Sequence, residues 1–143
     1  MPYKVVITLR HLAGDEEECQ KIGGELFTIP CYTEEEVIAA THDADAVITG
    51  MECLVPYTRK VISKLERCRI IHNIGTGYER IDVPAATDFG ICVSYPGAYC
   101  AEEVAEHTMA LLLACARRIL RLDKAVRQGN WGFPARHEMT EIW

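Results

Sequence analysis

Apolar residues in the first two thirds of the chain occur in short β-branched runs that alternate with amphipathic segments. The runs predict five strands, at residues 4–9, 25–29, 45–49, 69–73 and 91–94. Residues that commonly open helices stand before the amphipathic segments: Asp15, Thr33, Pro56 and Asp82. Gly23 and Gly90 suit the ends of two of these helices. The pattern therefore predicts an unbroken alternation of strands and helices.

Strands that are joined by single helices cannot be hairpin partners, so the sheet is expected to be parallel. Right-handed crossovers then place helices on both of its faces. We expect an α/β architecture, a flavodoxin-like doubly wound sheet of five parallel strands in the order 2-1-3-4-5.

The last third of the chain has a different pattern. Residues 101–128 contain no strand signal and no glycine or proline, which predicts one long interdomain helix that ends at Gly129. Its segment 109–116 is apolar on every face and must be covered by another domain or by a second copy of the chain. We therefore expect the protein to associate, as a homodimer.

Composition narrows the class of protein. Of the 143 residues, 49% are hydrophobic and 25% are charged, as in soluble globular proteins. The net charge of −6 gives no electrostatic reason to bind nucleic acid or an anionic membrane, and no apolar run is long enough to span a bilayer. Seven cysteines without a leading signal peptide favour the cytoplasm, and the spacing of cysteines and histidines predicts no metal site.

The segment that follows the fourth predicted strand, residues 73–78, is the main candidate for chemistry. It lies at a carboxyl end of the sheet, where ligands of open α/β folds bind. Gly75 and Gly77 allow the backbone to approach a ligand, and its N–H groups can form a nest for a carboxylate or phosphate. A plain tight turn explains the same residues. Because position 80 is Arg80, the segment is not a dinucleotide-binding fingerprint.

Four motifs in a fixed order extend this interpretation. Residues 71–90, Tyr95-Pro-Gly97, residues 103–113 and residues 125–131 together resemble the D-isomer-specific 2-hydroxyacid dehydrogenases. The branches that they resemble most are the 3-phosphoglycerate dehydrogenases and the C-terminal-binding-protein relatives. The resemblance is weakest before residue 45.

The resemblance implies a function for each part of the chain. Residues 1–99 are expected to be the substrate-binding domain, and residues 100–143 the connector helix and the start of an NAD-binding Rossmann domain. By resemblance, Asn73, Ile74, Gly75 and Thr76 hold the carboxylate of a small 2-hydroxy or 2-keto acid. Thr76 and Thr108 are expected to lie near the cofactor, which is NAD, with NADP as the alternative.

The resemblance also implies what the chain lacks. Up to Trp143, nothing matches the family's Gly-x-Gly-x-x-Gly turn or its catalytic Arg, Glu and His. We therefore assign no catalytic residue, and expect NAD to be bound mainly by a missing domain and the 143-residue chain alone to be inactive. Two alternatives stay open at this stage, a non-catalytic flavodoxin-like binding module of the corepressor type and an inactive truncated product.

Overall fold

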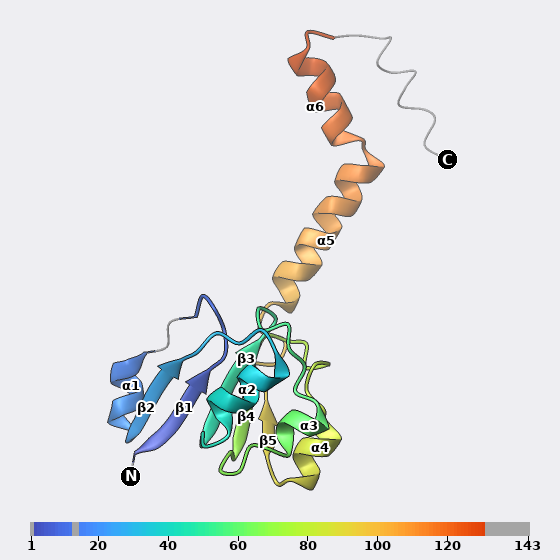
Figure 1. Ribbon diagram of the computed structural model, residues 1–143. Coiled ribbons are helices and arrows are strands. Elements are labelled where there is room, and N and C mark those ends of the chain that lie inside the picture. Colours follow the sequence, from blue (N-terminus) through green and yellow to red (C-terminus); the bar gives the residue numbers. More distant parts are fainter. Residues whose placement is uncertain (1, 13–14, 131–143) are drawn as a thin grey trace. The chain divides into compact units, whose positions relative to one another are not determined.

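The computed structural model describes residues 2–12 and 15–130, in two compact units, Met1–Tyr99 and Cys100–Trp143. The first unit contains five strands: β1 (Tyr3–Ile7), β2 (Gly24–Thr28), β3 (Ala46–Gly50), β4 (Ile70–Ile74) and β5 (Cys92–Ser94). All pair in parallel, in the order β2-β1-β3-β4-β5 (Figure 1). The predicted sheet and strand order are confirmed.

Four helices connect these strands: α1 (Glu16–Lys21), α2 (Glu34–Thr41), α3 (Arg59–Ile62) and α4 (Val83–Asp88). Three of the expected caps form. The side chain of Asp15 accepts a hydrogen bond from the N–H of Glu18 at 3.0 Å, and that of Asp82 accepts one from Ala85 at 2.8 Å. Thr33 caps α2 in the same way. These bonds satisfy N–H groups that the first turn of a helix leaves free.

The start of α3 differs from the prediction. We expected Pro56 to open this helix, but it begins at Arg59, after the N-cap Thr58. The cause is Tyr57, whose backbone N–H donates to the carbonyl of Arg80 at 2.7 Å and whose carbonyl accepts from Asp82 at 3.0 Å. A residue that pairs in this extended manner cannot also belong to a helical turn.

The core lies mainly between the sheet and three of the helices. Val6, Val47 and Ile71, on three adjacent strands, are fully buried, as are Val37 of α2 and Val61 of α3. Burial of each such side chain stabilises the fold by about 1.5–3 kcal/mol. Helix α1 lies on the other face of the sheet, where Cys19 and Ile22 line a groove with Val5 and Ile48, so the fold is doubly wound as expected.

The second unit contains α5 (Ala101–Ala116) and α6 (Ile119–Arg127). The expectation of one continuous helix over residues 101–128 is wrong, because Arg118 is left-handed, with φ 51° and ψ 34°. Its N–H donates to the carbonyl of Cys115 at 3.0 Å, and so closes the end of α5. Arginine is a strong helix former, so propensity gave no signal for this break. The predicted stop at Gly129 is confirmed by its φ of 80° directly after Gln128, the C-cap of α6.

Within residues 2–12 and 15–130, no helix has both the length and the apolar character that a membrane span requires.

Candidate functional site

The candidate loop begins where β4 leaves the sheet. Ile74 is the last residue of the strand, and Gly75 follows it with a φ of 139°. Residues with a Cβ rarely adopt this backbone conformation, so the turn depends on glycine at this position. The loop therefore emerges at the carboxyl edge of the sheet, as predicted.

Asn73 determines the orientation of the loop's peptide groups. It is only 6% exposed, and its Nδ2 atom donates to the carbonyl oxygens of Gly75 at 3.1 Å and Gly77 at 2.8 Å. Because peptide groups are planar and trans, the N–H groups of Thr76 and Tyr78 point away from these carbonyls. Across the described part of the chain, no group accepts a hydrogen bond from either N–H. The loop thus presents two free donors, two residues apart, which suits an anion.

Two further residues brace the loop against neighbouring segments. Arg80 donates from Nη1 to the carbonyl oxygen of Leu54 at 2.7 Å. Tyr57 is buried, and its hydroxyl lies 3.0 Å from Oγ1 of Thr8, just beyond the end of β1. These contacts join the carboxyl ends of β1, β3 and β4. The sequence analysis missed both residues, since no spacing in the sequence indicates that Arg80 reaches the Leu54 carbonyl.

An aromatic contact lies on the β5 side of the loop. The rings of Tyr78 and Tyr95 are tilted by 43° and their centroids are 5.3 Å apart. Such tilted pairs are worth about 0.5–1.5 kcal/mol beyond the area that they bury. Tyr95 follows β5 directly, so the contact links the loop to the next strand of the sheet.

Two buried titratable groups, Tyr57 and Cys31, lie near this edge. Burial raises the pKa of Tyr57, and burial together with nearby Cys53 raises the pKa of the Cys31 thiol to about 11. Both groups are therefore neutral at physiological pH and neither is an activated nucleophile. No cluster of three or more metal-ligating side chains occurs in residues 2–12 and 15–130. The free N–H groups of the loop are able to bind and orient an anion.

The structure places the predicted site residues as follows. Asn73 is buried, Ile74 is 37% exposed, and Thr76 is exposed on the loop next to Gly75, so these four consecutive residues span the end of β4 and the start of the loop. Thr108 lies on α5, in the second unit, and its hydroxyl donates to the carbonyl of Val104 in its own helix at 2.7 Å.

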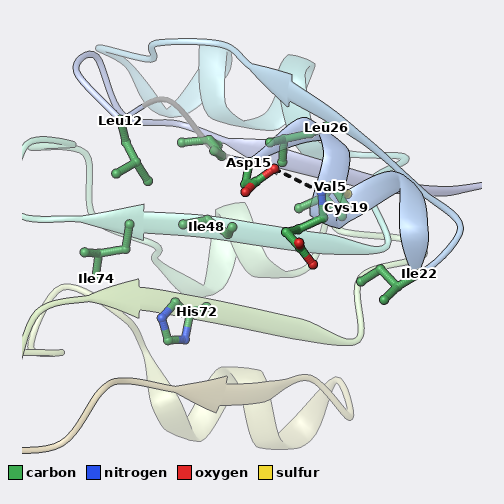
Figure 2. Close-up of a pocket in the computed structure, with 11 residues that line it drawn as sticks. Val5, Leu12, Asp15, Cys19, Ile22, Leu26, Ile48, His72 and Ile74 are labelled. Atoms are coloured by element: carbon green, nitrogen blue, oxygen red, sulfur yellow. Dashed lines mark hydrogen bonds between the residues drawn. The ribbon is translucent and has the colours of Figure 1, made fainter.

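A second concave feature lies on the face of the sheet that α1 partly covers (Figure 2). This groove has a volume of about 510 Å³, and apolar side chains line most of it: Val5, Ile7, Leu12, Ile22, Leu26, Ile48 and Ile74. Its polar groups include His72, whose Nδ1 atom lies 2.7 Å from the Ser94 hydroxyl, and the carboxylates of Asp15 and Glu18. An apolar groove with acidic side chains does not suit a small acid, so the loop is the better candidate for an anion.

Comparison with known proteins agrees with the resemblance found in the sequence. A family model described as "D-isomer specific 2-hydroxyacid dehydrogenase, catalytic domain" matches residues 5–141. D-3-phosphoglycerate dehydrogenase of Methanocaldococcus jannaschii is 37% identical over 108 residues, which are 76% of this chain and 20% of that protein. Glyoxylate reductase of Pyrococcus furiosus is 36% identical over 97 residues, 68% of this chain and 28% of that protein.

The fold is also similar to that of solved structures. An acyclic imino acid reductase in complex with NADPH and D-Arg superposes with a TM-score of 0.76 at 28% identity, over 91% of this chain and 42% of that one. The chain thus spans between a fifth and three tenths of the length of the two curated relatives described above.

Proposed function

Because the chain belongs to the D-isomer specific 2-hydroxyacid dehydrogenase family, we propose that residues 1–99 are the substrate-binding domain of a nicotinamide-dependent oxidoreductase. The enzyme acts on the CH–OH group of a small D-2-hydroxy acid, or reduces the matching 2-keto acid. Residues 100–143 are the connector and the start of the NAD-binding Rossmann domain. The two curated relatives, a phosphoglycerate dehydrogenase and a glyoxylate reductase, support this reaction class.

The observation that carries the proposal is the fixed loop after β4. Asn73 holds the carbonyls of Gly75 and Gly77 inward, so the N–H groups of Thr76 and Tyr78 are free to donate to a carboxylate. Asn73 acts through the loop and is a positioning residue, whereas Ile74, Gly75 and Thr76 supply the surface that contacts the acid. A carboxylate held by two donors fixes the adjacent C2 atom, which is where the reaction occurs.

The proposal also concerns which cofactor binds and which residues contact it. The reductase solved with NADPH supports a nicotinamide cofactor, which supplies the hydride chemistry when bound. The pyrophosphate of such a cofactor is usually bound by a Gly-x-Gly-x-x-Gly turn. This sequence has no such turn, so the described residues do not fit that group. We propose that NAD, or alternatively NADP, is bound mainly by the missing domain and that Thr76 and Thr108 contact it near the substrate.

Homodimer formation in the cytoplasm completes the proposal. The support for a dimer is the apolar surface of α5, where Met109, Leu111, Leu112 and Leu113 are 53%, 54%, 56% and 52% exposed. Contiguous apolar side chains of this kind are usually covered in the native assembly. Seven free cysteines agree with a reducing compartment.

A non-catalytic binding module of the corepressor type is the second candidate. The apolar groove beside α1 favours it, because its volume of about 510 Å³ is in the range of ligand sites. Such a module would bind its ligand in the groove and would leave the loop after β4 unoccupied.

Calorimetry on the purified chain tests the proposal. Titration with pyruvate should give a dissociation constant on the order of 1 mM, since only a few contacts are available. The Gly75→Ala variant, which cannot form the turn, should lose this binding, and neither protein should oxidise NADH. An absence of pyruvate binding would contradict the substrate site. Turnover at about 1 s⁻¹ or faster would contradict the assignment of catalysis to residues outside this chain.

A further inference from the structure

Negative charge lies directly beside the proposed carboxylate site. A Cβ atom built on Gly77 would lie 2.7 Å from Oε2 of Glu79, so the Glu79 carboxylate rests against the loop. The side chain is exposed and makes no ion pair with any residue of the described part of the chain. Any anion on the free N–H groups of Thr76 and Tyr78 therefore approaches the Glu79 carboxylate.

A second carboxylate, that of Glu52, follows the end of β3 at the same edge of the sheet. Gly50, the last residue of β3, pairs with Ile74, the last residue of β4. The two strand ends are close, since a Cβ atom on Gly50 would lie 3.1 Å from the Ile74 carbonyl oxygen. Glu52 is exposed two residues beyond Gly50. It thus adds negative charge near the loop.

Positive side chains offset these two charges only in part. Arg80 keeps its charge, but its guanidinium donates to the Leu54 carbonyl, 2.7 Å away, and forms no ion pair with a carboxylate of the described residues. Arg10 follows β1. Because β3 lies between β1 and β4, the axes of β1 and β4 are about 10 Å apart, and Arg10 begins at that distance from the loop. Among residues 2–12 and 15–130, no lysine or arginine forms a hydrogen bond or ion pair with residues 73–79.

Resting on the proposed function, we infer that the site selects acids with a single negative charge and rejects acids that carry a second anionic group, with Glu79 as a specificity-determining residue. Two unit charges about 7 Å apart in water change a dissociation constant by about threefold. A phosphate group brings up to two further charges, so Glu79 alone should disfavour it by up to about ninefold at low salt. The ligand class is thus a small monocarboxylate whose remainder is uncharged.

A matched pair of acids tests this inference. D-glycerate and 3-phosphoglycerate differ only in the phosphate group. Each is titrated at low salt into the full 143-residue chain, and affinities are read from the NMR shifts of the amide groups of residues 75–78. The wild-type chain should bind D-glycerate several-fold more tightly, by up to about tenfold at low salt. Glu79→Gln should narrow this preference several-fold.

Glu66→Gln is the control variant. Glu66 is exposed and lies before β4, at the opposite edge of the sheet, so its replacement removes the same charge far from the loop. It should leave the preference for D-glycerate unchanged. Equal binding of the two acids by the wild-type chain, or an unchanged preference in Glu79→Gln, would overturn the inference and leave the proposed function intact. Failure of both acids to shift these amides would instead refute the proposed function.

Discussion

The side-chain Nδ2 atom of Asn73 lies 2.8 Å from the carbonyl oxygen of Gly77 and donates a hydrogen bond to it. The bond connects a buried residue of β4 to a loop residue four positions later. Since β4 is held between β3 and β5, the position of the Asn73 side chain is fixed by the sheet. The loop therefore receives its shape from the core, and its outward N–H groups are arranged before any ligand binds.

Replacement of Asn73 by alanine should loosen the loop. The change removes both hydrogen bonds from Nδ2 and leaves the carbonyls of Gly75 and Gly77 without this donor. The expected loss is about 1–3 kcal/mol in the free energy of unfolding, measured by urea denaturation. Affinity for pyruvate should fall as well, because the N–H groups of Thr76 and Tyr78 are no longer held in one orientation.

Thr76→Ala is the control for this prediction. Thr76 lies on the same loop, but its exposed side chain makes no hydrogen bond to any described residue. Its replacement should change the unfolding free energy by less than about 0.5 kcal/mol. Equal stability of the Asn73→Ala and wild-type chains would show that the amide of Asn73 does not organise the loop.

The two glycines of the loop should respond differently to alanine. Gly75 has a φ of 139°, so Gly75→Ala should cost on the order of 1–3 kcal/mol of stability. At Gly77 the new Cβ would meet only the end of the flexible Glu79 side chain, which is free to move. Gly77→Ala should therefore be the milder change in thermal unfolding. The opposite order would contradict the geometry of the loop.

Stability should fall at alkaline pH partly because of Tyr57. Burial raises its pKa in the folded protein, so the unfolded chain releases this proton first as the pH rises. The contribution of protonated Tyr57 to the free energy of unfolding is complete below about pH 10. Above this pH it is lost, at up to about 1.4 kcal/mol per pH unit. Tyr57→Phe should reduce this slope, and at neutral pH should lose about 0.5–1.5 kcal/mol with the hydrogen bond to Thr8. Denaturation curves that depend on pH equally in both proteins would contradict the assignment.

The apolar side chains of α5 should drive self-association. Light scattering on the purified chain at tens of micromolar is expected to give a mass above that of the monomer, because Leu111 and Leu112 are more than half exposed. Leu112→Lys should shift the distribution toward monomer, while Lys124→Ala on α6 should not. A wild-type chain that stays monomeric at this concentration would count against the proposed dimer.

The sheet was predictable because each of its strands carries a local signal. The β-branched run at β3 and the cap at Asp82 determine their own structures through short-range sterics and hydrogen bonds. The start of α3 was not predictable, because Tyr57 pairs with Arg80 and Asp82, about 25 residues away in sequence. The break at Arg118 was also hidden, since a left-handed arginine has no signature in composition.

The candidate site divides in the same way. Gly75 and Gly77 marked the loop in the sequence, since glycine is needed where the backbone turns sharply. The orientation of the peptide groups was not predictable, because it depends on which carbonyls the Asn73 side chain reaches. The negative charge beside the site was not predictable either. Glu79 contributes to this charge because its side chain lies against Gly77, which the sequence does not indicate.

Amide NMR spectra of the chain during titration with pyruvate test the central claim most directly. The amide signals of Thr76 and Tyr78 should move downfield in a saturable way, because these N–H groups are expected to donate to the carboxylate. Signals from residues around the groove, such as Cys19 and Ile48, should stay in place. Saturable shifts at the groove with none at Thr76 and Tyr78 would contradict the account.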